Sequence, residues 1–475
     1  MITRTFKQIA QMIGAGWNPD YQANPLIRGV SIDTRTLEPG NLFVPIVGDR
    51  MDGHRFVQQA LDKGAAAVLW EKSKPVPPAY GPVLLVDDSL LALQRLAKVY
   101  RSELPVRVIG ITGSNGKTST KDILAALLST TFKTQKTFGN LNNHLGVPLT
   151  LLALEEDTEM AVVEMGMSAL GEIQLLSSIA KPDAAIITNA SEVHLADLKS
   201  REYIVQAKLE IVCGLKEDGV LVYNGDNPRL TQPLSRLKGS YERLSFGDHP
   251  ANDVYPVHYT MDDTGVEFTI SDRECPRLRI PLLGKHQMIN ALAALSVARY
   301  FGISFARITK GLLQIEATGM RNEKIEIADG ITVINDAYKS NPSSLQAALD
   351  TLYEMEESRQ KIAVLGDMVE LGEESEKLHK SIGERLTAER LDHLFTLGRM
   401  AEHIAAAAKE ANYPVERITV CADKEQLINE LYQARREGRL EQSIILVKGS
   451  RALQLEDVIE ALQQQTEAGR KREGA

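Results

Sequence analysis

One stretch, residues 106–128, restricts the fold of this chain more than any other. An apolar run from Val106 to Ile111 turns through Gly113 and Gly116 into a lysine and a threonine, and an apolar helix pattern follows. This order is typical of a strand, a phosphate-binding loop and a helix, in which glycines let backbone N–H groups approach an anion. The usual spacing would put the first glycine at Ile111, so the loop is a variant. A glycine-rich turn without a ligand is the alternative, but the Lys–Thr pair favours a nucleoside triphosphate.

The loop assigns roles to particular residues. Lys117 is predicted to reach the outer phosphates, and the Thr118 hydroxyl is predicted to hold Mg²⁺. The residues expected to form the phosphate cradle are Gly113, Ser114, Asn115, Gly116, Lys117, Thr118 and Ser119.

Three further apolar runs indicate that the loop belongs to a parallel α/β sheet. They end at Glu164, Asn189 and Asn224, and helical segments separate them. Ligands gather at the carboxyl ends of parallel strands, so these side chains are site candidates by position. His194 follows the second run. Glu164 and His194 could hold a second Mg²⁺, although Mg²⁺ prefers oxygen ligands, or they could be rim residues bonded to the backbone.

The length of 475 residues favours two to four domains. We predict an N-terminal α/β unit over residues 1–104, a central unit over 105–317 and a third α/β unit over 318–475. Within the central unit, residues 265–270 and 278–282 alternate apolar and polar side chains, which predicts antiparallel strands. The expected fold class is therefore α/β.

Composition excludes several functional classes. The formal net charge of −9 argues against a partner that is nucleic acid. No run of about 18 apolar residues is present, and the first residues do not read as a signal sequence, so we expect a cytosolic protein without a membrane span. Cys213, Cys275 and Cys421 lack the spacing of a zinc site or of a disulfide framework and are predicted to be buried thiols.

Two helical segments carry further candidates. Lys208 lies on a helix with apolar and polar faces, where a lone lysine is normally a solvated surface residue. His286 and Asn290 are four residues apart and therefore share a helix face. An amide on that face could read an adenine edge, and a capped packing helix is the alternative.

Two strand ends of the third unit also carry polar residues. Asp336 suits a ribose or an Mg²⁺-linked water, whereas an Asx-type turn and a helix cap would explain Asn341 but neither Asp336 nor Tyr338. Ser450 and Arg451 come just after another buried run. A guanidinium there is suited to gripping a carboxylate, because it donates two parallel hydrogen bonds.

In this order and over nearly the whole chain, these segments resemble the Mur ligases of peptidoglycan assembly. The last three matching blocks resemble those of family members that add a dipeptide. The matching segments are Ser31 to Arg35, Pro39 to Phe43, Asp52 to His54, Thr112 to Thr118, Gly139 to Pro148, Glu164 to Ser168, Asn189 to His194, Ala207 with Lys208, His286 to Asn290, Asp336 to Pro342, Val364 to Gly372 and Lys448 to Arg451.

The resemblance implies three domains: an N-terminal one for a UDP-sugar, a central ATP-binding one, and a Rossmann-like C-terminal one that closes over ATP and binds the incoming amine. It implies ATP-dependent joining of D-alanyl-D-alanine to UDP-N-acetylmuramoyl-tripeptide through an acyl phosphate. These two small molecules would be the substrates of a monomeric, cytoplasmic enzyme.

The resemblance also implies residue roles. Two Mg²⁺ sites are expected, with Thr118 at one and with Glu164, His194 and an N-carbamylated Lys208 at the other. Carbamylation turns a lysine into an anion, so it would no longer repel the metal. Nucleotide contacts are implied for His286, Asn290, Arg321 and Asp336, and substrate contacts for Ser31, Arg35, Asn142, Asn143, Tyr338, Asn341, Ser450 and Arg451.

Three segments differ from the sequence motifs that are commoner in the family: those around His194, from Ala337 to Pro342, and before Arg321. Two alternative functions stay open. A sister ligase would add one amino acid to a muramyl precursor, or glutamate to folate, and the blocks from Asp336 and at Arg451 speak against it. A nucleotide-binding regulator without catalysis is opposed by the joint presence of Glu164, His194, Lys208 and Arg451.

Overall fold

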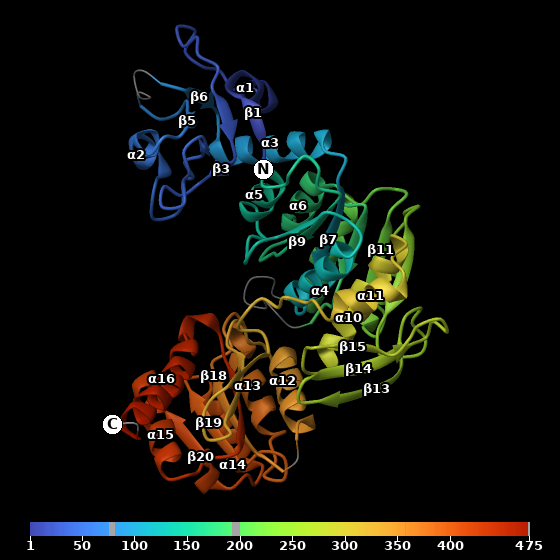
Figure 1. Ribbon diagram of the computed structural model, residues 1–475, viewed down its shortest axis with the longest axis vertical. Coiled ribbons are helices and arrows are strands. Elements are labelled where there is room, and N and C mark those ends of the chain that lie inside the picture. Colours follow the sequence, from blue (N-terminus) through green and yellow to red (C-terminus); the bar gives the residue numbers. More distant parts are fainter. Residues whose placement is uncertain (76–80, 192–199, 357, 474–475) are drawn as a thin grey trace.

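The computed structural model of the protein describes residues 1–75, 81–191, 200–356 and 358–473. In this part of the chain, strands and helices follow one another in three successive α/β units, coloured blue, green to yellow, and orange to red in Figure 1. The predicted α/β class is confirmed. No helix of the described ranges is long and apolar enough to cross a membrane.

The first unit is built on a parallel sheet in the order β3-β4-β5-β6. Its last helix joins it to the second unit, because the hydroxyl of the fully buried Tyr100 donates to the Leu154 carbonyl at 2.9 Å. The elements are β1 (Thr3–Thr5), α1 (Phe6–Ile13), β2 (Leu26–Arg28), β3 (Val30–Ser31), β4 (Leu42–Phe43), η1 (Gly53–Phe56), α2 (Val57–Asp62), β5 (Ala67–Glu71), β6 (Val83–Val86) and α3 (Ser89–Glu103).

The second unit carries the phosphate loop on a parallel sheet in the order β12-β11-β10-β7-β9-β8. Because β7 lies between β10 and β9, the loop leaves the sheet interior with neighbouring strand ends on both sides. A smaller antiparallel sheet, β13-β14-β15, packs on the same apolar core as α4 and α10. The elements are β7 (Arg107–Thr112), α4 (Lys117–Ser129), β8 (Thr134–Lys136), α5 (Gly146–Leu152), β9 (Met160–Glu164), α6 (Glu172–Ala180), β10 (Ala184–Ile187), α8 (Arg201–Leu209), η2 (Glu210–Cys213), β11 (Val220–Asn224), α9 (Pro228–Arg236), β12 (Glu242–Phe246), β13 (Pro256–Asp262), β14 (Gly265–Ile270), β15 (Leu278–Ile280), α10 (Lys285–Tyr300) and α11 (Phe305–Leu312).

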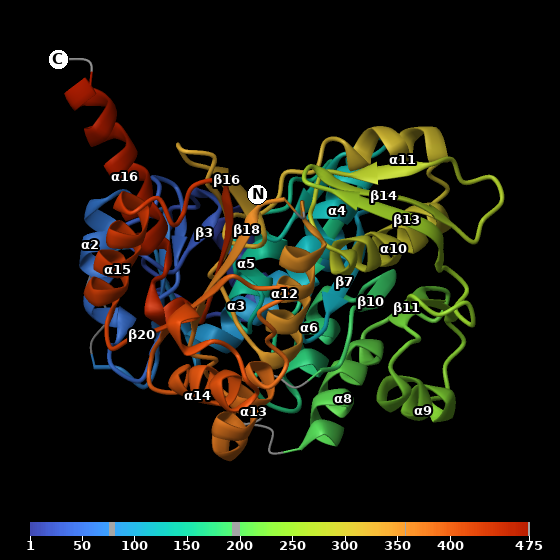
Figure 2. The same cartoon turned by 90° about the horizontal axis from the view of Figure 1, so that it is seen from below.

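The third unit has the sheet order β16-β17-β21-β18-β19-β20, in which only the pairing of β16 with β17 is antiparallel among the described strands. Its helix α12 lies beside α10 of the second unit (Figures 1 and 2). The elements are β16 (Glu323–Glu326), β17 (Thr332–Asp336), α12 (Pro342–Glu354), β18 (Gln360–Gly366), η3 (Gly372–Glu374), α13 (Ser375–Gly383), β19 (His393–Leu397), α14 (Glu402–Glu410), η4 (Val415–Arg417), β20 (Ile418–Cys421), α15 (Lys424–Arg436), β21 (Ser443–Lys448), η5 (Arg451–Leu453) and α16 (Glu456–Glu473).

Two sequence predictions differ from the structure. The second antiparallel strand ends at Ile280 rather than at residue 282, because Pro281 has no N–H for a strand ladder. The prediction of three buried thiols is wrong for two of them. Cys421 is buried, but Cys275 is half-buried and Cys213 is exposed at the end of η2.

Candidate functional site

A cavity of about 730 Å³ lies where the phosphate loop of the second unit meets the linker and the strand ends of the third unit. Side chains from segments far apart in the sequence converge on it. The predicted residues that line it are Ser114, Asn115, Gly116, Lys117, Thr118, Ser119, Asn142, Asn143, Glu164, Asn189, Asn224, His286, Asn290, Arg321, Asp336 and Tyr338.

The phosphate loop has a fixed shape because two of its glycines cannot be replaced. Gly116 has a φ of +79°, and an added Cβ would collide with the Asn290 amide. An added Cβ at Gly113 would collide with the Thr188 hydroxyl. The backbone N–H groups of Ser114 and Asn115 both donate to the Asn189 side-chain oxygen, at 3.1 and 2.9 Å. Asn189, a candidate by its place at a strand end, therefore holds the loop.

Lys117 begins α4 and folds back over the loop. Its Nζ donates to the Gly113 carbonyl at 2.7 Å and to that of Ser114 at 3.4 Å. Burial lowers the pKa of Lys117 to about 8, and the negative charge of Glu164 opposes this effect. A cation that has lost its hydration and is held by neutral carbonyls gains from the arrival of an anion.

Three side chains from different positions in the sequence approach the Glu164 carboxylate. This carboxylate, 2% exposed, accepts a hydrogen bond from the Thr118 hydroxyl at 2.9 Å and another from the Asn142 amide at 2.8 Å. Lys121 also approaches, with its Nζ 3.9 Å from Glu164 Oε2. Sequence reasoning missed Lys121, although its place one turn after Lys117 on the same helix could have pointed to it.

The described residues offer an oxygen-rich place for a cation. Glu164 and Thr118 present a carboxylate and a hydroxyl at the cavity wall, which are ligand types that suit Mg²⁺ together with phosphate oxygens and waters. No group of three or more His, Cys, Asp or Glu side chains gathers as a metal site in the described part of the chain. His194 lies outside the described residues.

Lys208 is buried rather than solvated, so the expectation for a lone helical lysine is wrong. Its side chain on α8 is 1% exposed. Burial, reinforced by the positive charges of Lys117 and Lys339, holds the pKa of Lys208 well below its usual range. Burial therefore favours the neutral amine of Lys208 over its charged form.

The start of α10 forms another wall of the cavity. His286 Nε2 lies 2.7 Å from the side-chain nitrogen of Asn322, and burial lowers the pKa of His286 to about 4. Asn290 donates to Gln287 at 3.2 Å and packs on Gly116. These two residues do face the cavity together, as their spacing predicted.

The opposite wall comes from the third unit. The Arg321 guanidinium lies over the Tyr338 ring at 4.3 Å from its centre. Asp336, at the end of β17, accepts from Lys448 Nζ at the end of β21 at 2.5 Å. Lys448 also lines the cavity and is 1% exposed. Its ammonium is therefore a buried ion-pair partner of Asp336.

Four predicted substrate residues lie elsewhere. In the first unit, the Ser31 hydroxyl donates to the Asp33 carbonyl at 2.9 Å, and Arg35, with 87% of its side chain exposed, pairs with the Asp33 carboxylate at 2.5 Å. The Ser450 hydroxyl donates to the Asp367 carbonyl at 2.8 Å.

Arg451 is not among the residues that line the cavity. Its side chain is half-exposed and pairs with Glu456 at the start of α16. Asn341, the remaining predicted substrate residue, is buried at the start of α12 and contacts the phosphate loop.

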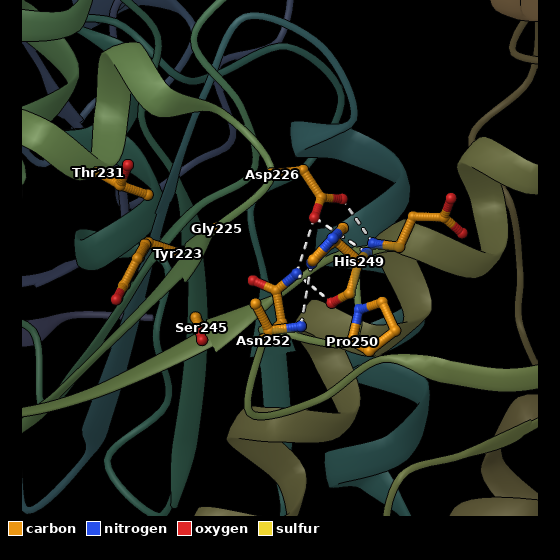
Figure 3. A pocket seen from close by; sticks show the side chains of 10 residues that line it. Tyr223, Gly225, Asp226, Thr231, Ser245, His249, Pro250 and Asn252 are labelled. Atoms are coloured by element: carbon orange, nitrogen blue, oxygen red, sulfur yellow. Dashed lines mark hydrogen bonds between the residues drawn. The ribbon is translucent and has the colours of Figure 1, made fainter.

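A second depression, of about 680 Å³, contains none of the predicted site residues (Figure 3). The carboxylate of Asp226, which lines it, already accepts several hydrogen bonds from within the protein. The Asp226 carboxylate accepts from the backbone N–H of Asp248 and His249 and from the Asn252 amide. We therefore place the chemistry in the first cavity.

Comparisons with known proteins cover nearly the whole chain. Models of three Mur ligase regions match it: the family's catalytic domain over residues 26–101, the middle domain over 111–298 and the glutamate ligase domain over 320–451. A UDP-N-acetylmuramoyl-tripeptide–D-alanyl-D-alanine ligase of Bacillus subtilis is 47% identical over 97% of this chain and 99% of its own length. The enzyme of that name from Escherichia coli is 36% identical over 98% of this chain and 99% of its own.

Solved structures agree with these matches. MurF from Acinetobacter baumannii aligns with a TM-score of 0.89 and 30% identity over 98% of this chain and 99% of that one. A MurF ligase from Thermotoga maritima in complex with ADP aligns with a TM-score of 0.81 and 29% identity over 93% of this chain and 98% of that one. A folylpolyglutamate synthase of Mycobacterium tuberculosis, at 18% identity, shares the fold alone.

Proposed function

The chain belongs to the Mur ligase family, and from this premise we propose that it is an ATP-dependent ligase that joins D-alanyl-D-alanine to UDP-N-acetylmuramoyl-tripeptide. The observation that carries the proposal is the match over nearly the full length of relatives that bear this name. The cavity supports it, because a phosphate loop, a buried carboxylate and polar residues of the third unit meet there.

ATP is needed because a carboxylate is a poor electrophile. In the proposed reaction the terminal carboxylate of the tripeptide attacks the γ-phosphorus, which forms an acyl phosphate and releases ADP. The amine of the dipeptide then attacks the acyl carbon, loses a proton, and the tetrahedral intermediate expels phosphate to leave an amide bond. The loop N–H groups and Lys117 stabilise the negative charge that develops on the transferred phosphoryl group.

Lys117 changes partners in this scheme. In the structure its ammonium rests on the Gly113 carbonyl, 2.7 Å away. A bound polyphosphate offers a stronger, charge-assisted acceptor and raises the pKa of Lys117 from about 8, so the side chain binds it as a full cation. Water exclusion by the surrounding cavity protects the acyl phosphate from hydrolysis.

We further propose two Mg²⁺ sites, one at Thr118 and one at Glu164 with His194 and Lys208. Bound there, Mg²⁺ would neutralise charge on the phosphates as a Lewis acid. The oxygen donors of Thr118 and Glu164 suit this ion, and each already holds a hydrogen bond that fixes its direction.

The buried amine of Lys208 supports the proposal that this residue becomes an N-carbamate. Only a neutral amine adds carbon dioxide, and burial lowers the pKa of Lys208 strongly. We expect ¹³C-labelled bicarbonate to give a carbamate signal in wild-type protein and no such signal in Lys208→Arg. Equal spectra for the two proteins would contradict the carbamate.

The remaining roles are proposed from the family resemblance, and the residues among them that line the cavity agree with it in position. His286 and Asn290 would contact adenine, and Arg321 and Asp336 would contact ribose or phosphate. The UDP-sugar peptide and the dipeptide would contact Ser31, Arg35, Asn142, Asn143, Tyr338, Ser450 and Arg451.

We also propose the domain boundaries after residues 104 and 317, which fall between the elements of successive sheets. The proposed enzyme is a monomer, as the family resemblance led us to expect. It would work in the cytoplasm, where its co-substrate ATP is made.

The test is phosphate release from Mg-ATP with UDP-N-acetylmuramoyl-tripeptide, with product mass measured in parallel. We expect release and the mass of an added dipeptide with D-alanyl-D-alanine, and no release with single amino acids. Turnover with one amino acid would assign the chain to a sister ligase, and an absence of turnover with any amine would leave a nucleotide-binding role.

A further inference from the structure

Four polar side chains join the phosphate loop to the start of α12. Asn115 and Asn341 exchange amide hydrogen bonds, with Asn341 Nδ2 2.6 Å from Asn115 Oδ1 and Asn115 Nδ2 3.1 Å from Asn341 Oδ1. Asn115 Nδ2 also lies 2.9 Å from Ser343 Oγ, which in turn lies 3.1 Å from Ser191 Oγ. We call Asn115, Ser191, Asn341 and Ser343 the loop–helix latch.

Asn341 uses each half of its amide differently. Its oxygen caps α12, because it accepts the Ser344 N–H at 3.0 Å, and the Asn341 N–H is within 3.1 Å of the Ser344 hydroxyl. Its Nδ2 has no part in the cap and donates to Asn115. Helix capping alone therefore accounts for an oxygen at residue 341 but not for an amide nitrogen.

The backbone and the side chain of Asn115 also have different partners. Its backbone N–H donates to Asn189, which follows β10 in the same unit, whereas its side chain reaches across to α12. The side chain therefore joins two units of the protein and leaves the anion cradle to the backbone. Ser191 belongs to the same rigid group, because its backbone exchanges hydrogen bonds with the Ser114 hydroxyl at 2.8 and 3.0 Å.

The latch fixes the separation between two walls of the cavity. On one side of it stands the phosphate loop with Lys117, and on the other the turn before α12, which carries Asp336, Tyr338 and Lys339 to the cavity wall. If the latch opens, these two walls can separate while each keeps its own internal hydrogen bonds.

We propose that Asn341 and Ser343 are positioning residues, which seat α12 on the phosphate loop and so hold the two walls of the cavity at the separation that phosphoryl transfer requires. This role replaces the substrate contact expected for Asn341. The inference rests on the proposed ligase function for its kinetic readout, and on the hydrogen bonds alone for its structural readout.

The decisive variant is Asn341→Asp. Aspartate caps a helix as well as asparagine does, so α12 keeps its start. The donor to Asn115 Oδ1 is lost, so at most the hydrogen bond from Asn115 Nδ2 to the residue-341 oxygen remains of the exchange. Asp423→Asn is the matched control, because it makes the reverse exchange at the cap of α15, away from the latch.

We expect Asn341→Asp to lower kcat about tenfold, while affinity for Mg-ATP alone changes less than about threefold, since the cradle is intact. Small-angle scattering should show a larger radius of gyration for Asn341→Asp with Mg-ATP than for wild-type protein with Mg-ATP. The control should match wild type in both measurements.

Ser343→Ala keeps the Asn341–Ser344 cap bonds and guards against a folding defect in the first variant. We expect it to lower kcat about threefold, and to combine with Ser191→Ala non-additively because both hydroxyls share one network. Wild-type kcat and scattering in both Asn341→Asp and Ser343→Ala would overturn the latch. If wild-type protein itself fails to ligate the dipeptide, the proposed function falls, and the scattering comparison still decides on the latch.

Discussion

The cavity and the N-terminal sheet hold their predicted residues in opposite ways. At the cavity, partners come from distant parts of the chain and are buried: Thr118 donates to Glu164, and Asn115 to Asn341. In the first unit, Ser31 and Arg35 both bind Asp33, only two positions away, and Arg35 is exposed.

This difference teaches how each region can work. The cavity is preorganised, because long-range hydrogen bonds already hold several of its side chains. The first unit presents an exposed cation whose partner is local, so a change there should weaken binding of one substrate without disturbing the chemistry. Four predictions test this contrast.

The largest effect is expected for Lys117→Met. The variant keeps an apolar stem of similar length but removes the cation beside the phosphate loop, so phosphate release should fall about 10³-fold. Lys98→Met, at an exposed site on α3, is the control and should retain wild-type activity. A Lys117→Met enzyme within tenfold of wild type would show that the loop alone handles the phosphates.

Glu164→Gln should lower kcat about 10²-fold and raise the Mg²⁺ concentration needed for half-maximal rate, because a neutral amide is a poor ligand for a hard cation. The amide keeps an oxygen that can accept from Thr118 or Asn142, so the melting temperature should change little. Magnesium titrations with Glu425→Gln, on the exposed start of α15, give the comparison. An unchanged Mg²⁺ dependence would remove Glu164 from the metal site.

Acid should lower the stability of the folded protein through His286, which lines the cavity. In the unfolded chain this histidine binds a proton near pH 6.5, whereas burial delays protonation in the folded protein to about pH 4. The unfolded state thus binds more protons between these values, and the free energy of unfolding falls as the pH is lowered from 6.5 to 4, by about 2 kcal/mol from this group. Urea titrations of His286→Gln should show a shallower loss over this window than wild-type protein, and parallel curves would contradict the prediction.

Arg35→Ala should have the smallest effect. Loss of this exposed cation should raise KM for UDP-N-acetylmuramoyl-tripeptide about fivefold and leave kcat and the melting temperature unchanged, since Arg35 contributes no buried contact. Steady-state kinetics with each substrate varied in turn measure this. A fall in kcat with constant KM would mean that the first unit takes part in the chemical step.

Much of the fold could be predicted from the sequence. Short apolar runs ending in Glu164 and Asp336 are strands β9 and β17, and the helix after the phosphate loop begins at Lys117. Such patterns succeed because burial on both faces of a parallel sheet demands continuous apolar runs. Where strand β15 stops short of the prediction, a proline without an N–H is the cause.

The candidate site could be predicted only in part. Residue type and strand-end or loop position marked Lys117, Glu164 and Asp336. For Lys121, the one available signal was its place one turn after Lys117, and no spacing in the sequence indicated that Lys448 pairs with Asp336. For Lys208, the helix pattern pointed to the surface and the structure buries it. Helix periodicity tells which face is apolar, but it does not tell which neighbour covers a polar face.

The sequence by itself determined the phosphate loop, the α/β class and the family, because these depend on residues adjacent in the chain or on an ordered series of short motifs. The tertiary structure alone decided which of the marked residues meet. It paired Asn115 with Asn341 across 226 positions and Arg451 with Glu456. The physical reason is that hydrogen bonds and ion pairs between distant segments depend on the packing of sheets and helices, which local patterns do not encode.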